Sequence, residues 1–158
     1  MMSDAQKRGG APVGYLSELD AVEATAVLCL RSWSNNSEVR SQVLGEISNA
    51  LGPTEGTRIL QAFDDICSLC ARYGRRPLMR HTPQCKCLGA DEACFANFIG
   101  AASDGDQEDA MLIASMIVRA DMAPSLAGLA ETFGLALKRM ALCARSRETG
   151  QPQTKMLH

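Results

Sequence analysis

The chain has little aromatic and β-branched character. Phe, Trp and Tyr together account for 4% of its 158 residues, whereas Ala, Leu and Met are plentiful. Unbranched side chains lose little rotamer freedom in a helix, so this composition favours helices over sheets. Apolar residues make up 46% of the chain and charged residues 22%, which is typical of a globular protein with one domain at this length.

A long apolar run is also missing. No segment reaches the roughly 20 consecutive apolar residues that a membrane-spanning helix needs. The first residues, MMSDAQKRGGAPVG, lack the apolar centre of a secretory signal peptide. We therefore expect a cytoplasmic protein without a membrane partner, in a compartment where thiols stay reduced.

Histidine is scarce, and this limits the enzymatic alternatives. His81 and His158 are the two histidines of the chain. Hydrolytic triads need a histidine with an orienting partner, and di-iron helical bundles need paired Glu-x-x-His motifs, which do not occur. His81 and Cys85 could form a Cys–His nucleophile pair, but the sequence identifies no orienting residue for them. We predict that the protein is not an enzyme.

Neither sign of charge predominates. The formal net charge of −2 argues against a protein whose whole surface binds nucleic acid or an anionic membrane. Both ends of the chain are polar and lack apolar periodicity. We predict disordered tails at residues 1–14 and 148–158, on either side of a single helical domain at 15–147.

Apolar residues recur with helical periodicity along this domain. The pattern predicts an all-α, single-domain bundle of about six helices. Ser17, Asp91 and Asp106 are the expected N-caps of the first, fourth and fifth helices. One long loop, residues 75–90, is expected between the third and fourth helices and contains cysteine and histidine. The expected helices cover residues 17–33, 37–50, 54–73, 91–102, 106–120 and 124–145.

The segment from Cys67 to Cys94 is rich in side chains that bind metals. It holds five of the seven cysteines and one of the two histidines. Zinc prefers four thiolate or imidazole ligands in a tetrahedral arrangement. No acidic residue lies between Asp65 and Asp91, and the arginines and lysine found there would offset the charge of bound thiolates. The sequence thus predicts a zinc site that staples the loop to the core, with the candidate ligands Cys67, Cys70, His81, Cys85 and Cys87.

Other interpretations of this segment stay open. Cys94 could replace Cys67 or Cys70 as a ligand, and an iron–sulfur cluster could use the same cysteines. Cys67 and Cys70 could instead be small core residues, because free cysteine is often buried. Arg75, Arg76, Arg80 and His81, around Pro77, could together bind a phosphate or a carboxylate.

The stretch SLAGLAETFGLALKRM, within residues 125–143, resembles the helix-turn-helix family of DNA-binding motifs. The resemblance implies that Gly134 makes the turn. It also implies that the helix after the turn enters the major groove and exposes Lys138 and Arg139. One continuous helix over residues 124–145 is the alternative.

These observations predict a non-catalytic, zinc-binding helical protein with a regulatory or interaction role. Its partner would be a protein that the sequence does not identify, and DNA is a second candidate partner through residues 125–143. The competing hypothesis is a thiol-based redox or iron–sulfur sensor that uses the same cysteines.

Overall fold

The computed structural model describes residues 8–33 and 37–156, and these form a mostly helical protein. The prediction of a helical bundle is confirmed in outline, but the small sheet was not predicted. The elements in chain order are β1 (Pro12–Tyr15), the 3-10 turn η1 (Leu16–Glu18), α2 (Ala21–Ser32), α3 (Ser37–Leu51), α4 (Pro53–Tyr73), β2 (Cys87–Gly89), α5 (Ala90–Ser103), α6 (Gln107–Ile117), the 3-10 turn η2 (Ala120–Met122) and α7 (Ala123–Met156).

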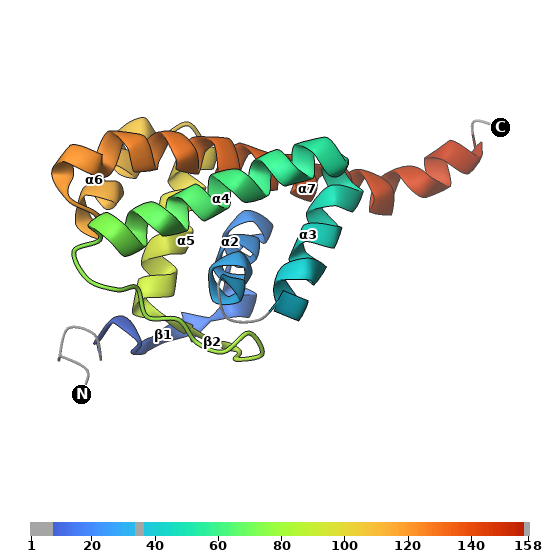
Figure 1. Ribbon diagram of the computed structural model, residues 1–158. Helices are drawn as coiled ribbons and strands as arrows, with labels where there is room; N and C mark the ends of the chain where they lie inside the picture. The colour runs from blue at the N-terminus through green and yellow to red at the C-terminus, as the bar shows by residue number, and fades with distance from the viewer. Residues whose placement is uncertain (1–7, 34–36, 157–158) are drawn as a thin grey trace.

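The last helix, α7, organises the bundle. It contacts α2, α3, α4, α5 and α6, and it lies beside α4 along one side of the molecule (Figure 1). The short sheet of β1 and β2 lies at the opposite side, beneath α2 and α5, and the C-terminal end of α7 projects beyond the bundle (Figure 1). The continuous helix therefore links elements that are far apart in sequence.

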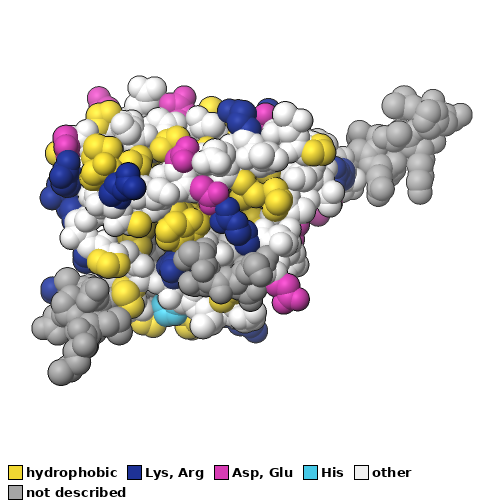
Figure 2. All heavy atoms as spheres, viewed as in Figure 1, with side chains coloured by type: hydrophobic (Ala, Val, Ile, Leu, Met, Phe, Trp, Pro, Cys, Tyr) yellow, Lys and Arg dark blue, Asp and Glu magenta, His cyan; other side chains and the backbone are white. Residues whose placement is uncertain are grey.

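The core is formed by the inward faces of these helices. The rings of Phe63 in α4 and Phe133 in α7 lie 5.1 Å apart between centroids, and those of Phe95 and Phe98 in α5 lie 6.5 Å apart. Each of these four side chains is at most 1% exposed. On the face shown in Figure 2, small groups of apolar side chains alternate with charged ones. None of the described helices is both long enough and apolar enough to cross a lipid bilayer.

Two expected helix starts are corrected by local hydrogen bonding. The first long helix, α2, begins after Asp20 rather than Ser17, because Asp20 accepts a hydrogen bond from the backbone N–H of Glu23 at 2.8 Å. At the start of α5 the N-cap is Gly89, not Asp91, and the backbone N–H of Gly89 donates to Glu92 at 3.0 Å. The N-cap of α6 is Asp106, as predicted.

The N-terminal segment is also more structured than predicted. Within the expected tail 1–14, residues 1–7 lie outside the described part, but Pro12–Tyr15 forms β1 and pairs antiparallel with β2. Tyr15 lies opposite Cys87 in this register. Gly9 is buried, and the backbone N–H of Ala90 donates to the carbonyl of Ala11 at 3.0 Å. At the other end, α7 continues to Met156, into the segment predicted to be a tail.

The expected turn at Gly134 is absent, because α7 runs through residues 125–143 without a break. The helix-turn-helix interpretation is therefore wrong for this segment, and the continuous-helix alternative holds. Gly134 has a packing role instead: a Cβ atom at this position would lie 2.9 Å from the carbonyl oxygen of Ile99 and 3.0 Å from the Cβ of Ser103, both in α5. A side chain here would separate α5 from α7.

A matched pair of substitutions in α7 tests this packing. We expect Gly134→Ala to lower the free energy of unfolding by about 1–3 kcal/mol, because the added methyl group meets the backbone of α5. Gly128 is exposed and a Cβ there meets nothing within 4 Å, so Gly128→Ala should raise stability by about 0.5–1 kcal/mol. Urea denaturation measures both. Equal effects of the two substitutions on the free energy of unfolding would contradict the close approach of α5 to α7 at Gly134.

Candidate functional site

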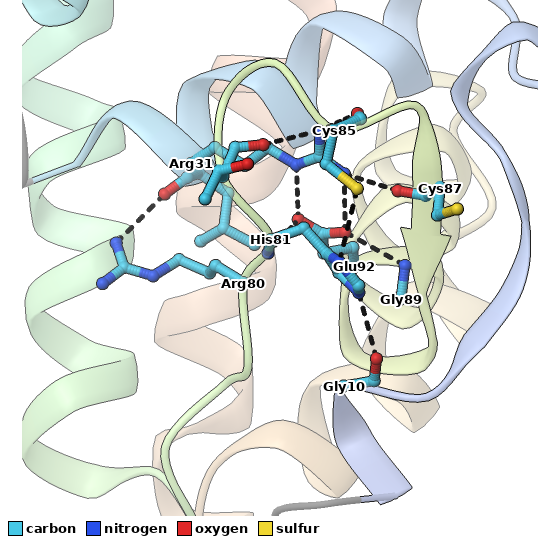
Figure 3. Close-up of polar contacts among 10 residues, drawn as sticks. Gly10, Arg31, Arg80, His81, Cys85, Cys87, Gly89 and Glu92 are labelled. Atoms are coloured by element: carbon cyan, nitrogen blue, oxygen red, sulfur yellow. Dashed lines mark hydrogen bonds and ion pairs between the residues drawn. The ribbon is translucent and has the colours of Figure 1, made fainter.

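A buried ion pair between α2 and α5 lies at the centre of the site. Arg31, near the end of α2, and Glu92, in the first turn of α5, are 1% and 0% exposed. Arg31 Nε donates to Glu92 Oε2 at 2.6 Å and Arg31 Nη2 donates to Oε1 at 2.9 Å, so the contact is bidentate (Figure 3). Planar, two-bond geometry of this kind gives the strongest ion pairs in proteins.

The other donors of Arg31 hold the loop between α4 and α5. Its Nη1 donates to the carbonyls of Thr82 at 3.2 Å and Cys85 at 2.7 Å, and its Nη2 donates to the carbonyl of Cys87 at 2.8 Å. With the two bonds to Glu92, all five N–H groups of the guanidinium have acceptors. One side chain thus fixes the path of residues 82–87.

Both carboxylate oxygens of Glu92 have further hydrogen-bond donors. Besides Arg31, Glu92 accepts hydrogen bonds from the backbone N–H groups of His81 at 3.1 Å and Gly89 at 3.0 Å. Burial alone raises the pKa of Glu92, but the hydrogen bonds from Arg31, Gly89 and His81 outweigh it, and the pKa lies below its ordinary value of 4.5. Glu92 is therefore a carboxylate at neutral pH.

The arginines of the loop have structural partners too. Arg76 forms an ion pair with Asp91, which also accepts from the backbone N–H of Met79 at 2.7 Å. Arg75 donates to the carbonyl of Ser115 at 2.7 Å, and Arg80 donates to the carbonyl of Trp33 at 2.8 Å, at the end of α2. These cations anchor the loop to three helices. They do not act as counter-charges around a cluster of thiolates, as the sequence had suggested.

His81 and Cys85 come together on this scaffold. The Sγ atom of Cys85 lies 3.6 Å from Nδ1 of His81, and Nε2 of His81 lies 3.0 Å from the carbonyl oxygen of Gly10 (Figure 3). A carbonyl can only accept a hydrogen bond, so Nε2 is the donor of this contact, and in the neutral ring Nδ1 is left as an acceptor facing the thiol of Cys85. The orienting group that the sequence lacked is thus a backbone carbonyl of the N-terminal segment.

The remaining predicted ligands lie elsewhere. Cys67 is buried in the core, and Cys70 lines a cavity with it on α4. Burial raises the pKa of Cys70 to about 12 and raises that of Cys67 as well, which keeps both thiols protonated. Burial also raises the pKa of Cys94. Cys87 belongs to β2, and its sulfur points away from His81 (Figure 3).

The five predicted ligands therefore do not form one site. No group of three or more His, Cys, Asp or Glu side chains that could hold a metal occurs among residues 8–33 and 37–156. A closed zinc site needs four ligands, and the structure brings together two of the predicted five, His81 and Cys85. All seven cysteines are free thiols.

Sequence reasoning missed Arg31 and Glu92. A weak signal existed, because Arg31 directly follows the apolar run AVLCL within a predicted helix. Glu92 is three residues after a glycine that precedes a helix, which is the spacing of a capping glutamate. Neither signal identifies the partner 61 positions away. Comparison with protein-family models, curated proteins and solved structures gives no match for this chain.

The buried pair makes stability dependent on pH. Because the pKa of Glu92 is lower in the folded state, its contribution to stability is present above pH 4.5 and is lost as the pH falls through the folded-state value. We expect Glu92→Gln to cost about 3–5 kcal/mol at neutral pH, because Arg31 is left buried without a counter-ion. The variant should also lose less stability than the wild type as the pH falls below 4.5.

Asp121→Asn is the control for this substitution. Asp121 pairs with Arg119 at the surface, where both side chains are more than half exposed. Solvent screens such a pair, so we expect little change in stability. Chemical denaturation of the three proteins between pH 3 and pH 7 makes the comparison (roughly the range over which carboxylates titrate). If the free energy of unfolding changed with pH in parallel for the wild type and Glu92→Gln, the lowered pKa assigned to Glu92 would be contradicted.

Proposed function

We propose that this protein is a non-catalytic, thiol-based regulatory protein of the cytoplasm in which Cys85 is the reactive group. The observation that supports this proposal is the chain of contacts from Cys85 Sγ to His81 Nδ1 and from His81 Nε2 to the Gly10 carbonyl. A nucleophile beside a base that is itself oriented by a third group is the arrangement that activates thiols. Cys85 is partly exposed, whereas Cys29 and Cys67 are buried.

The chemistry that suits this pair is oxidation by a hydroperoxide. His81 Nδ1 accepts the thiol proton, and the sulfur attacks the terminal oxygen of the hydroperoxide. The O–O bond breaks, the proton passes to the departing oxygen as an alcohol or water, and Cys85 becomes a sulfenic acid. The sulfur gives up one electron pair and the peroxide gains it. A thiol reductant would return Cys85 to its starting state.

Oxidation of Cys85 would change the position of the N-terminal segment. The Gly10 carbonyl loses its donor if the ring of His81 turns away from an oxidised Cys85. The segment is then held to the loop by the pairing of β1 with β2 and by two flanking backbone bonds, from Leu16 to Lys86 and from Ala90 to Ala11. We propose that the predicted protein partner recognises β1 and distinguishes its two positions. The helix-turn-helix route to DNA is excluded, because α7 is one helix through residues 125–143.

Zinc is the second candidate, for one geometric reason. Two ligands on a tetrahedral zinc ion, one sulfur at about 2.3 Å and one nitrogen at about 2.0–2.1 Å, lie about 3.6 Å apart, and Cys85 Sγ and His81 Nδ1 are separated by 3.6 Å. The His81 Nε2–H group donating to a carbonyl is also typical of a metal-bound histidine. Two ligands do not make a closed site, and the described residues supply no third.

Alkylation of the thiols tests the proposed reactivity. We expect iodoacetamide to modify Cys85 roughly tenfold faster than Cys143, because His81 assists the loss of the thiol proton. His81→Ala should remove this advantage at Cys85 and leave the rate at Cys143, which is exposed on α7, unchanged. Peptide mass spectrometry measures each rate.

The same experiment distinguishes zinc from a free thiol. A bound ion would protect Cys85 until a chelator is added, and elemental analysis would find about one equivalent that is lost in His81→Ala. Rapid alkylation without chelator and without bound metal is the result we expect. Equal rates at Cys85 and Cys143, with or without chelator, would contradict both candidates.

Hydrogen exchange tests the proposed displacement of the N-terminal segment. Treatment with hydrogen peroxide should accelerate exchange of the backbone amides of residues 13–15 in β1, because the contact between His81 and Gly10 is lost. In Cys85→Ser the same treatment should have no effect on these amides. The amides of α7 serve as the internal control, since they lie away from the loop. Unchanged exchange of these amides in an oxidised wild-type protein would exclude a displacement of β1 on oxidation of Cys85.

A further inference from the structure

A cavity of about 130 Å³ lies between the C-terminal ends of α2 and α4, the following loop and α5. Its walls are mainly apolar and include the side chains of Leu30, Trp33, Leu78 and Phe95. The thiols of Cys67 and Cys70 complete the wall on the side of α4. The cavity lies apart from the contact between Cys85 and His81, which are not among its lining residues.

The size and lining of this cavity suit a compact apolar group. A cavity of about 150 Å³ with a leucine, isoleucine and phenylalanine lining stays dry and binds benzene. Here the rings of Trp33 and Phe95 offer the same kind of surface. Burial keeps Cys67 and Cys70 protonated, so these thiols behave as small apolar groups rather than as metal ligands.

One cation, Arg80, belongs to the lining. Its Nη1 atom donates to the carbonyls of Leu30 at 3.2 Å and Trp33 at 2.8 Å, which holds the guanidinium in place. The guanidinium carbon also lies 6.0 Å from the centroid of the Trp33 ring. Among the described residues, Nη2 and Nε have no hydrogen-bond acceptor, and no Asp or Glu lines the cavity.

An arginine with free donors beside an apolar cavity is suited to one class of small molecule. We propose that this cavity binds a small carboxylic acid with a compact apolar body, such as an aromatic ring. The body would occupy the space between Trp33 and Phe95, and the carboxylate would accept hydrogen bonds from Arg80. The anion site predicted over residues 75–81 reduces to Arg80. Arg75 and Arg76 already have acceptors in Ser115 and Asp91, and the ring of His81 contacts Gly10 and Cys85.

Trp33 gives a direct signal, because it is the single tryptophan of the chain and lines the cavity. We would titrate the full chain with benzoate and, separately, with benzene, and follow tryptophan fluorescence and isothermal calorimetry. We expect saturable binding of both probes, with benzoate bound more tightly. In Arg80→Met, benzoate should bind about tenfold more weakly while benzene binding changes little.

A second variant keeps the test independent of the role of Arg80 at the end of α2. Ala71 is exposed on α4 and lines the cavity, so Ala71→Phe should fill the space and abolish binding of both probes without removing any interior contact. Ala144→Phe, at an exposed position of α7, is the matched control and should bind like the wild type.

Each remaining outcome overturns the proposal. Tighter binding of benzene than of benzoate would mean that the cavity is an apolar site without a role for Arg80. No saturable signal from either probe, or an equal signal in Ala71→Phe, would mean that the cavity is a packing defect that takes no ligand.

Discussion

The loop between α4 and α5 depends on one buried ion pair. Arg31 and Glu92 are removed from water, and such pairs stabilise a fold only when every hydrogen-bonding group is satisfied. This condition is met by three carbonyls of the loop on the side of Arg31 and by the backbone N–H groups of His81 and Gly89 on the side of Glu92. The loop and the pair thus need each other. Without the loop the charges would be unsatisfied, and without the charges the loop backbone would lack partners.

This interdependence explains why apolar residues would not serve equally well between α2 and α5. A well-packed apolar pair can match a buried ion pair in stability. Here, however, an apolar replacement would leave the carbonyls of Cys85 and Cys87 and two N–H groups without these protein partners, each at a cost of about 1–3 kcal/mol. The carbonyl of Thr82 would keep the backbone N–H of Cys85 as its donor. The ion pair selects one conformation of residues 81–89. That conformation places His81 against Cys85 and β2 against β1.

The sequence was informative where structure depends on local pattern and uninformative where it depends on distant pairing. Periodicity predicted the helices, and Asp106 was recognised as a cap because its partner is three residues away. The pairing of Arg31 with Glu92 could not be read in this way, since isolated charges on two helices have no local signature. The same limit explains the misinterpretation of Arg76 and Arg80. Their clustering with cysteines suggested metal chemistry, but their partners are Asp91 and the end of α2. Gly134 likewise resembled a turn residue because its contact with α5 cannot be seen in sequence.

His81 joins the rigid and the less firmly held parts of the site. Its backbone N–H donates to Glu92 and belongs to the buried network, while its ring contacts Cys85 on one side and the Gly10 carbonyl on the other. The network on the backbone side has many bonds in the protein interior, and the N-terminal segment has few bonds at the surface. A chemical change at Cys85 would therefore displace the N-terminal segment more readily than the buried network around Glu92. Glu92 is bound by the backbone of His81 and Gly10 by its ring, so a change at Cys85 that moves the ring would act on the N-terminal segment.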